Sequence, residues 1–182
     1  MSTSLRGVFA TDAGMLALWD RQNFQAIIDY ETWEPELLED EDIQRHILAG
    51  AYVPLYIHSD GAFGCEVRVG DTSAPAVLST REQEYRFMTS QPYLFRSPGE
   101  AYLSGIEHVE GEPGQSVGRV TVAPGNYAVT VSMLEWDKEP GAKGEDGQPV
   151  ADALPDFLVL LNLVTGQEEF RTKVDTFDEP SA

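Results

Sequence analysis

The sequence predicts a mainly β fold: an antiparallel β-sandwich of about nine short strands with two short helices inserted near the N-terminus. From Tyr52 onward, apolar residues recur with the period of two that a half-buried strand requires. Glycine and proline separate these segments at the spacing of antiparallel strands, and no helical pattern alternates with the later strands as a βαβ sheet requires. We therefore expect one domain over residues 1–177 with a helical insertion at about 20–50, followed by a flexible tail at 178–182.

Two extended segments are predicted at the start of the chain. Residues 5–10 and 15–19 are rich in apolar and aromatic side chains, and Thr-Asp-Ala-Gly at 11–14 between them is typical of a turn or a bulge.

Two helices are predicted next. Asp20 is a suitable N-cap for a helix over residues 21–30, because Phe24, Ile27 and Ile28 form one apolar stripe at helical spacing. Pro35 suits the first turn of a second helix over residues 36–49, which Gly50 ends. The inward face of that helix is expected to carry Leu37, Ile43, Ile47 and Leu48.

A first hairpin is predicted around Ser59-Asp60-Gly61, because Asp-Gly tolerates the positive φ angles of a tight turn. Its strands are residues 52–58 and 63–69. Pro54 cannot donate a hydrogen bond to a neighbouring strand, so it indicates an edge strand or a bulge.

A second hairpin is predicted around residues 123–126, Ala-Pro-Gly-Asn, where proline and glycine occupy the positions that a type II turn requires. Its strands are residues 117–122 and 127–136. In the second of these strands one face is apolar and the other polar, so one face can be buried; the apolar face consists of Tyr127, Val129, Val131 and Met133.

The remaining strands are predicted from shorter apolar runs. Residues 157–163 form an almost continuous apolar run and are predicted to be a central strand, with residues 170–174 as a final partner. A long loop over residues 137–155 precedes that strand. The other expected strands are residues 85–89, 93–96, 101–104 and 106–109.

The composition excludes several classes of protein. Twelve Lys and Arg against 31 Asp and Glu leave a formal charge of -19, which argues against a partner with a phosphate backbone such as nucleic acid. No run of about 18 apolar residues occurs, and the first six residues lack the apolar segment of a signal peptide, so we expect no membrane partner and a cytoplasmic location. Cys65 is the one cysteine, and alternation places it with Val67 and Val69 on a face expected to be buried, where its thiol is inert.

The strongest local charge lies between residues 29 and 42, where eight carboxylates occur without an intervening basic residue. A solvated helix face explains such a run, but the mutual repulsion of these carboxylates is also relieved by a cationic partner. Trp33 lies within the run, either as an apolar anchor for that partner or as packing between the two helices. The predicted partner-binding residues are Asp29, Tyr30, Glu31, Trp33, Glu34, Glu36, Glu39, Asp40, Glu41 and Asp42.

No catalytic residue, metal site or cofactor is predicted. The sequence lacks the EF-hand, nucleophile-elbow, phosphate-loop and dinucleotide-binding patterns, and its three histidines, His46, His58 and His108, are not at a spacing that presents two metal ligands together. Calcium held by carboxylates from several loops stays open. So does the alternative of an enzyme or a carbohydrate-binding β-sandwich that uses loop carboxylates with the aromatic residues Tyr93, Tyr102 and Trp136.

Three stretches resemble a known pattern: residues 120–131, VTVAPGNYAVTV; residues 10–20, ATDAGMLALWD; and residues 60–69, DGAFGCEVRV. They resemble competence protein J-like nuclease inhibitors and related uncharacterised bacterial β-sandwich families, which place a Pro-Gly-x-Tyr turn before a late strand. The resemblance covers about a third of the chain and implies a bacterial, acidic, non-enzymatic sandwich that neutralises a nuclease or toxin. Our hypothesis is therefore an acidic protein-binding module, an inhibitor or immunity-type protein, whose carboxylates imitate phosphates toward a basic protein partner.

Overall fold

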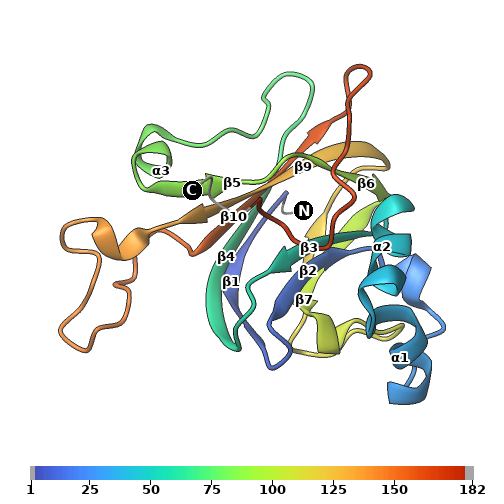
Figure 1. Cartoon of the computed structure of the whole chain (residues 1–182). Coiled ribbons are helices and arrows are strands. Elements are labelled where there is room, and N and C mark those ends of the chain that lie inside the picture. Colours follow the sequence, from blue (N-terminus) through green and yellow to red (C-terminus); the bar gives the residue numbers. More distant parts are fainter. Residues whose placement is uncertain (1–2, 179–182) are drawn as a thin grey trace.

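The computed structural model describes residues 3–178, which form two β-sheets packed face to face (Figure 1). In the described chain the first sheet has six strands in the order β1, β4, β10, β9, β5, with β6 also paired to β9: β1 (Ser4–Thr11), β4 (Gly61–Val69), β10 (Phe157–Leu163), β9 (Gly125–Leu134), β5 (Arg86–Thr89) and β6 (Tyr93–Ser97). The second has four: β3 (Tyr52–Tyr56), β2 (Met15–Trp19), β7 (Glu100–Gly105) and β8 (Gly118–Thr121). The mainly β, sandwich-like class predicted from the sequence is confirmed.

The strand β10 is central, as its apolar run predicts. It runs parallel to β4, with Phe157 opposite Cys65, and antiparallel to β9, with Phe157 opposite Met133. A strand covered on both faces has no solvent side, and Leu158, Val159 and Leu161 are fully buried.

Both predicted hairpins are wrong in the same way. The strands β3 and β4 are consecutive but lie in different sheets, because β3 pairs with β2 and β4 pairs with β1. The strands β8 and β9 also lie in different sheets, where β7 and β10 are their partners. A turn motif indicates that the chain reverses its direction, but the packing of the two sheets determines which strands pair. Here each turn connects a strand of one sheet to a strand of the other. The prediction of an edge strand from Pro54 is confirmed, since β3 is the last strand of its sheet.

The predicted first helix, residues 21–30, is wrong. Asp20 does act as a cap, accepting a hydrogen bond of 2.9 Å from the Gln22 amide, but only the short 3-10 helix η1 (Arg21–Phe24) follows. The expected stripe fails because Ile27 is buried whereas Ile28 is 75% exposed.

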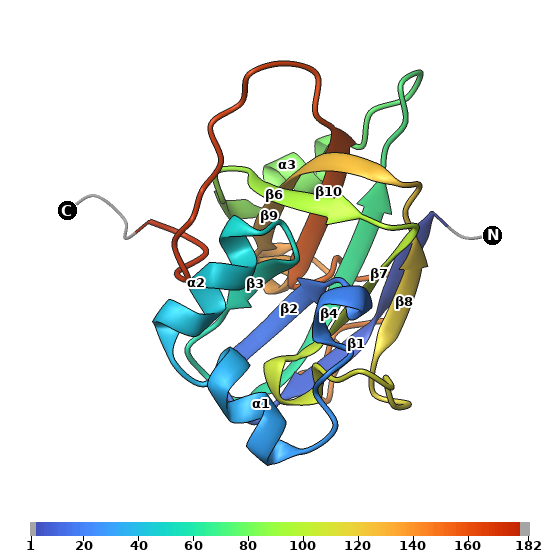
Figure 2. The same ribbon diagram turned by 90° about the vertical axis from the view of Figure 1, so that its right-hand side faces the viewer.

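The predicted second helix, residues 36–49, is two helices, α1 (Tyr30–Leu37) and α2 (Asp40–Leu48). The first begins early because Asp29 and Thr32 form a reciprocal capping box, and Pro35 then lies inside it and removes a donor near its end. Gly50, with φ of 74°, ends α2 as predicted, while Leu48 is exposed rather than inward-facing. Both helices lie in front of β2 and β3 (Figure 2).

Several smaller elements also differ from expectation. Residues 106–108 form the 3-10 helix η2 (Ile106–His108) instead of a strand, and residues 170–174 are irregular. Two further short helices, α3 (Thr80–Glu84) and η3 (Trp136–Lys138), were not predicted. The long loop before β10 projects from the body at the left of Figure 1. The predicted tail lies outside the described residues except for Asp178, whose carboxylate pairs with Arg171 at 3.0 Å.

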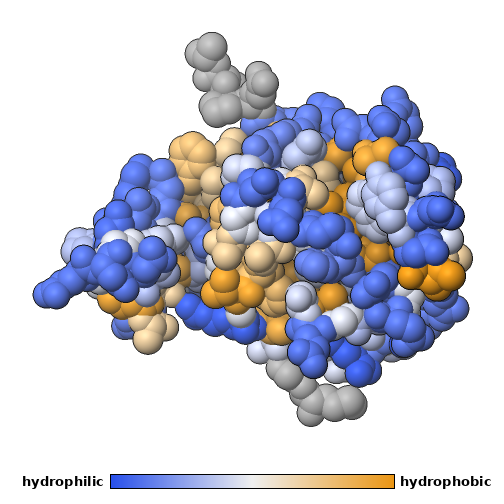
Figure 3. Space-filling model, turned by 90° about the horizontal axis from the view of Figure 1, so that it is seen from below, coloured by the Kyte–Doolittle hydropathy of each residue, from blue (hydrophilic) through white to orange (hydrophobic). Residues whose placement is uncertain are grey.

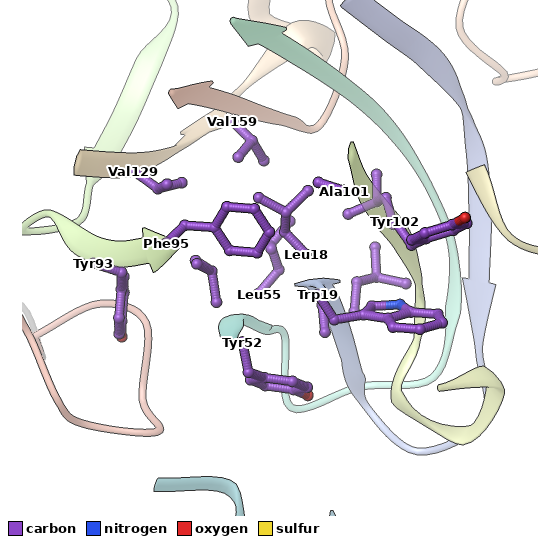
Figure 4. Packing of buried hydrophobic residues seen from close by; sticks show 14 of the residues in the cluster. Leu18, Trp19, Tyr52, Leu55, Tyr93, Phe95, Ala101, Tyr102, Val129 and Val159 are labelled. Carbon is purple, nitrogen blue, oxygen red and sulfur yellow. The ribbon is translucent and has the colours of Figure 1, made fainter. Parts of the chain in front are cut away.

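The core between the sheets is built from aromatic and branched side chains. Trp19, Tyr52, Tyr93 and Phe95 are fully buried and converge with side chains from both sheets (Figure 4). Cys65 is buried as predicted, and burial raises the pKa of its thiol.

Candidate functional site

The helix α1 presents two aromatic rings side by side. Its N-cap Asp29 accepts hydrogen bonds from the Thr32 amide at 2.9 Å and the Thr32 hydroxyl at 2.8 Å, which fix the first turn. Tyr30 and Trp33 follow at a spacing of three residues, so they lie on one face, with ring centroids 5.8 Å apart and ring planes at 22°. Tyr30 is 62% exposed, which is unusual for a ring of this size.

Trp33 is held in the fold on one side and remains partly open on the other. Its indole Nε1 donates a hydrogen bond of 3.0 Å to the carbonyl oxygen of Ile106, and its ring packs against the main core. It is only partly buried, and its remaining surface borders a hollow. Trp33 is therefore both a packing residue and part of an open surface.

That hollow has a volume of about 260 Å³ and lies between α1 and the segment that follows β7. Its apolar part comes from the two aromatic rings and from the buried side chains of Ile27 and Val109. Three acidic residues, Asp29, Glu107 and Glu110, also border it. Figure 3 views the molecule from below, where α1 and residues 106–110 lie, and shows hydrophobic side chains exposed among hydrophilic ones.

Two of these acidic side chains, Asp29 and Glu107, accept hydrogen bonds from neutral donors. The hydroxyl and amide of Thr32 lower the pKa of Asp29. Glu107 accepts hydrogen bonds from the Thr11 hydroxyl at 2.9 Å and from the Asp12 amide at 3.0 Å. Within residues 3–178, no Lys or Arg forms an ion pair with any of the three, and the nearest imidazole, His108, is 3.8 Å from Glu107.

Hydrogen bonds join the two sides of the hollow, which are α1 with the residues just before it (the near wall) and residues 106–112 (the far wall). The Gly111 amide donates to the carbonyl oxygen of Ile27 at 2.8 Å, and Arg21 Nε donates to the Gly111 carbonyl oxygen at 2.6 Å. Arg21 also pairs with Glu112 at 2.8 Å. These bonds hold residues 106–112 against η1 and α1, so the hollow is part of the folded state.

The other predicted partner-binding residues divide into two groups. Glu36 and Asp42 are paired within the chain: both lie near Arg45, at 3.8 and 3.1 Å, and Glu36 also contacts His46 Nε2 at 2.8 Å. Burial lowers the pKa of His46, and the Glu36 carboxylate opposes that shift only in part. The rest form no ion pair with the described residues; they are Glu31, Glu34, Glu39, Asp40 and Glu41.

The predicted residues are not all on one face. Asp29, Tyr30 and Trp33 border the hollow described above, whereas Asp40 and Glu41 border a second depression beside Gln44 and Lys173. Sequence reasoning missed Glu107, Val109 and Glu110, which come from about 75 residues further along the chain. The acidic stretch IEHVEGE at residues 106–112 is the signal that could have found them.

The aromatic residues of the alternative function do not come together. Tyr93 is fully buried, and its hydroxyl donates to the carbonyl oxygen of Lys173 at 2.8 Å; Tyr102 is also buried. Trp136 borders a separate hollow of about 500 Å³ under the projecting loop, where its Nε1 donates to Asp156 at 2.9 Å. The other Asp156 oxygen accepts from the Gly64 amide, so this carboxylate anchors the loop.

In the described part of the chain, no group of three or more His, Cys, Asp or Glu residues is arranged to hold a metal ion. None of the helices between residues 3 and 178 has the length and apolar character needed to cross a membrane.

No protein-family model matches the sequence, and no curated protein matches it significantly. Among solved structures, one similar chain is described as "Crocagin biosynthetic gene J", with a TM-score of 0.58 and 19% identity over 90% of this chain and 97% of that chain. Another is ComJ, inhibitor of the DNA degrading activity of NucA, from Bacillus subtilis, with a TM-score of 0.47 and 9% identity over 90% of this chain and 99% of that one. The sequence resemblance to competence protein J-like proteins thus has a counterpart among solved structures. At these identities the likeness concerns the fold alone.

Proposed function

We propose that the chain is a protein-binding module and that α1, the start of α2 and residues 106–110 form the face that contacts a basic protein. The observation that carries the proposal is the exposed stack of Tyr30 on Trp33 beside acidic residues that form no ion pair with Lys or Arg in the described chain. Aromatic residues surrounded by a polar rim are typical of the energetic centre of a protein interface.

The electrostatics support a cationic partner. With a formal charge of -19, the chain attracts basic proteins over long distances at low salt and repels acidic ones. Glu31 and Glu34 add charge on the helix that carries the aromatic stack, and Asp40 and Glu41 add charge at the start of α2; none of the four forms an ion pair with the described residues. Such rim charges speed encounter and select partners more than they add affinity.

The finer proposal is that the partner is a basic nuclease or toxin. Carboxylates would then occupy the groove that normally holds the phosphates of its substrate, as the sequence resemblance implied. The shared fold does not decide this, since one fold supports unrelated functions. The enzyme or carbohydrate-binding alternative has less support, because Tyr93 and Tyr102 lie in the core instead of lining an open cleft.

The test compares two variants that each lose four negative charges. The first changes the proposed face (E31Q/E34Q/D40N/E41Q). The matched control changes four exposed carboxylates elsewhere that also lack ion pairs with described residues (D60N/E84Q/E145Q/E169Q). Proteins captured from a lysate of a bacterium that encodes this chain are identified, purified and measured by calorimetry at low and high salt.

We expect a basic protein that binds the wild type and the control equally, binds the face variant at least about tenfold more weakly, and loses affinity at high salt. Equal binding by the two variants, or no basic protein bound at low salt, contradicts the proposal. The finer proposal is tested by adding this chain to the purified partner in a nucleic-acid degradation assay, where undiminished degradation contradicts inhibition.

A further inference from the structure

We propose that the hollow between Tyr30, Trp33 and residues 107–110 is a recognition pocket for one arginine side chain of the partner. The proposal depends on the proposed function for the existence of that partner, and it deepens it by naming the group that is bound. The sequence suggested that an aromatic side chain of this protein fills a pocket on the partner. In the structure the aromatic residues line a hollow instead, so the pocket lies on this protein and the inserted side chain belongs to the partner.

The size of the hollow suits one side chain. Its volume of about 260 Å³ lies below the roughly 300–1,000 Å³ of typical small-molecule sites. The buried side chains of Ile27 and Val109 provide an apolar floor for the methylene groups of a long side chain, while Tyr30 and Trp33 provide ring surface. A cation over such a ring is attracted by its electron-rich face.

The charge of the hollow selects a cation. Three acidic residues, Asp29, Glu107 and Glu110, border it, and the hydrogen bonds that the carboxylates of Asp29 and Glu107 receive come from neutral hydroxyl and amide groups. Within residues 3–178 no Lys or Arg forms an ion pair with any of the three, and His108 Nε2 lies 3.8 Å from Glu107. An anion is repelled here, and a neutral group leaves the three charges uncompensated.

Arginine fits better than lysine for two reasons. Its planar guanidinium stacks on aromatic rings, and its five N–H donors can reach several carboxylates at once, whereas the lysine ammonium is a compact and strongly hydrated charge. The walls are already in place, since Trp33 is bonded to Ile106 and Gly111 is bonded to Ile27. Binding therefore requires little ordering of the pocket.

The test uses the full chain and small probes, so it does not require the partner. N-acetyl-arginine amide is titrated while the indole N–H signal of Trp33 is followed by NMR, with the signal assigned from a Trp33→Phe variant. N-acetyl-lysine amide and N-acetyl-citrulline amide, which is neutral and close to arginine in shape, are the comparison probes. We expect a saturable shift with arginine, and binding of citrulline and lysine weaker by roughly tenfold and severalfold.

The pocket variant is Asp29→Asn with Glu110→Gln, because asparagine retains the N-cap while the charge is removed. The matched control is Glu145→Gln with Glu169→Gln, two exposed carboxylates away from the hollow. The pocket variant should bind the arginine probe about tenfold more weakly and the control should bind it like the wild type. Equal binding of citrulline or lysine, equal effects of the two variants, or no saturable shift at Trp33 each overturns the proposal. A basic protein that binds normally to the pocket variant overturns it too, while leaving the proposed function in place.

Discussion

The hydroxyl of Thr176 completes the outer edge of β3, and removing it tests how that edge is held. Its Oγ1 accepts a hydrogen bond of 2.8 Å from the Tyr56 amide and donates one of 2.7 Å to the carbonyl oxygen of Pro54. Thr176 is 1% exposed, so water does not replace these bonds without local opening. The Thr176 side chain thus provides the two hydrogen bonds that a neighbouring strand would otherwise form with these backbone groups.

Thr176→Val preserves the shape of the side chain and leaves both backbone groups without a partner. A buried polar group left unpaired costs about 1–3 kcal/mol, and we take the lower half of that range because the irregular segment 170–177 can move to admit water. For the two groups the expected loss is about 2–4 kcal/mol in the free energy of unfolding, or roughly 4–16 °C in Tm for a chain of this length. Thr176→Ser keeps the hydroxyl and loses one buried methyl group, so it should cost about 1 kcal/mol.

Urea denaturation followed by far-ultraviolet circular dichroism measures both variants. Thr165→Val is the control, because it makes the same chemical change at an exposed position and should stay within about 0.5 kcal/mol of the wild type. If Thr176→Val is as stable as this control, the hydroxyl is not what holds the edge of β3. A change in the slope of the unfolding curve would instead indicate a change in the compactness of either state.

Three further predictions follow from single positions. Burial lowers the pKa of His46, so the unfolded chain takes up this proton at a higher pH than the folded chain does; the stability from neutral His46 is complete above the unfolded pKa of about 6.5 and is lost as the pH falls below it. Between about pH 7.5 and about pH 5.5 the urea midpoint should therefore drop more for the wild type than for His46→Gln, and equal drops would refute this. Because burial raises the pKa of the Cys65 thiol, a thiol reagent at about pH 8 should modify it only in denaturant, and rapid labelling of the folded chain would contradict the buried position. Gly50→Ala should cost about 1–2 kcal/mol in a denaturation experiment, since φ is 74° and the new Cβ would lie 2.8 Å from Arg96 Cγ; an unchanged midpoint would show that the constraint is absent.

The elements that the sequence predicts well are those with a local physical cause. The apolar run of β10 has no polar face, so it can only be a central strand. Asp20 and Gly50 act through groups within two residues of themselves, a cap and a left-handed turn. Pro54 lacks a donor wherever it lies, which places its strand at an edge.

Strand partners depend on groups that are distant in the sequence. The turn before β9 has the residues of a hairpin turn, yet β8 pairs with β7 and β9 pairs with β10, because in a sandwich the apolar faces of both sheets must meet across the core. Residues 170–174 have the alternation of a strand, but the segment forms no ladder: the Arg171 amide donates to the carbonyl oxygen of Pro92, and side chains of Tyr93 and Gln44 bond to its carbonyl oxygens. Nothing in a local pattern distinguishes these arrangements.

In the candidate site, too, the parts with a local cause were predictable and the parts that depend on distant contacts were not. The near wall was predictable, since Tyr30, Trp33 and Asp29 lie within five residues of one another and a helix brings them to one end. The far wall depends on the bond from Trp33 to Ile106 and on the bond from Gly111 to Ile27, which join segments more than 70 residues apart. Two carboxylates of the acidic run are engaged within the fold, since Glu36 contacts Arg45 and His46, and Asp42 contacts Arg45.

The distribution of basic residues sharpens the functional argument. Across the described residues, most arginines are engaged by carboxylates at structural positions, as in the Arg68 pairs with Glu66 and Glu82 and the Arg81 pair with Glu139. A chain with 31 acidic and 12 basic residues cannot neutralise every carboxylate, so the fold determines which ones stay uncompensated. A charge excess that served solubility alone would not require exposed aromatic rings in its midst, because each such ring favours association. The proposed cationic partner accounts for an exposed Tyr30 ring beside these acidic residues, which solubility alone does not.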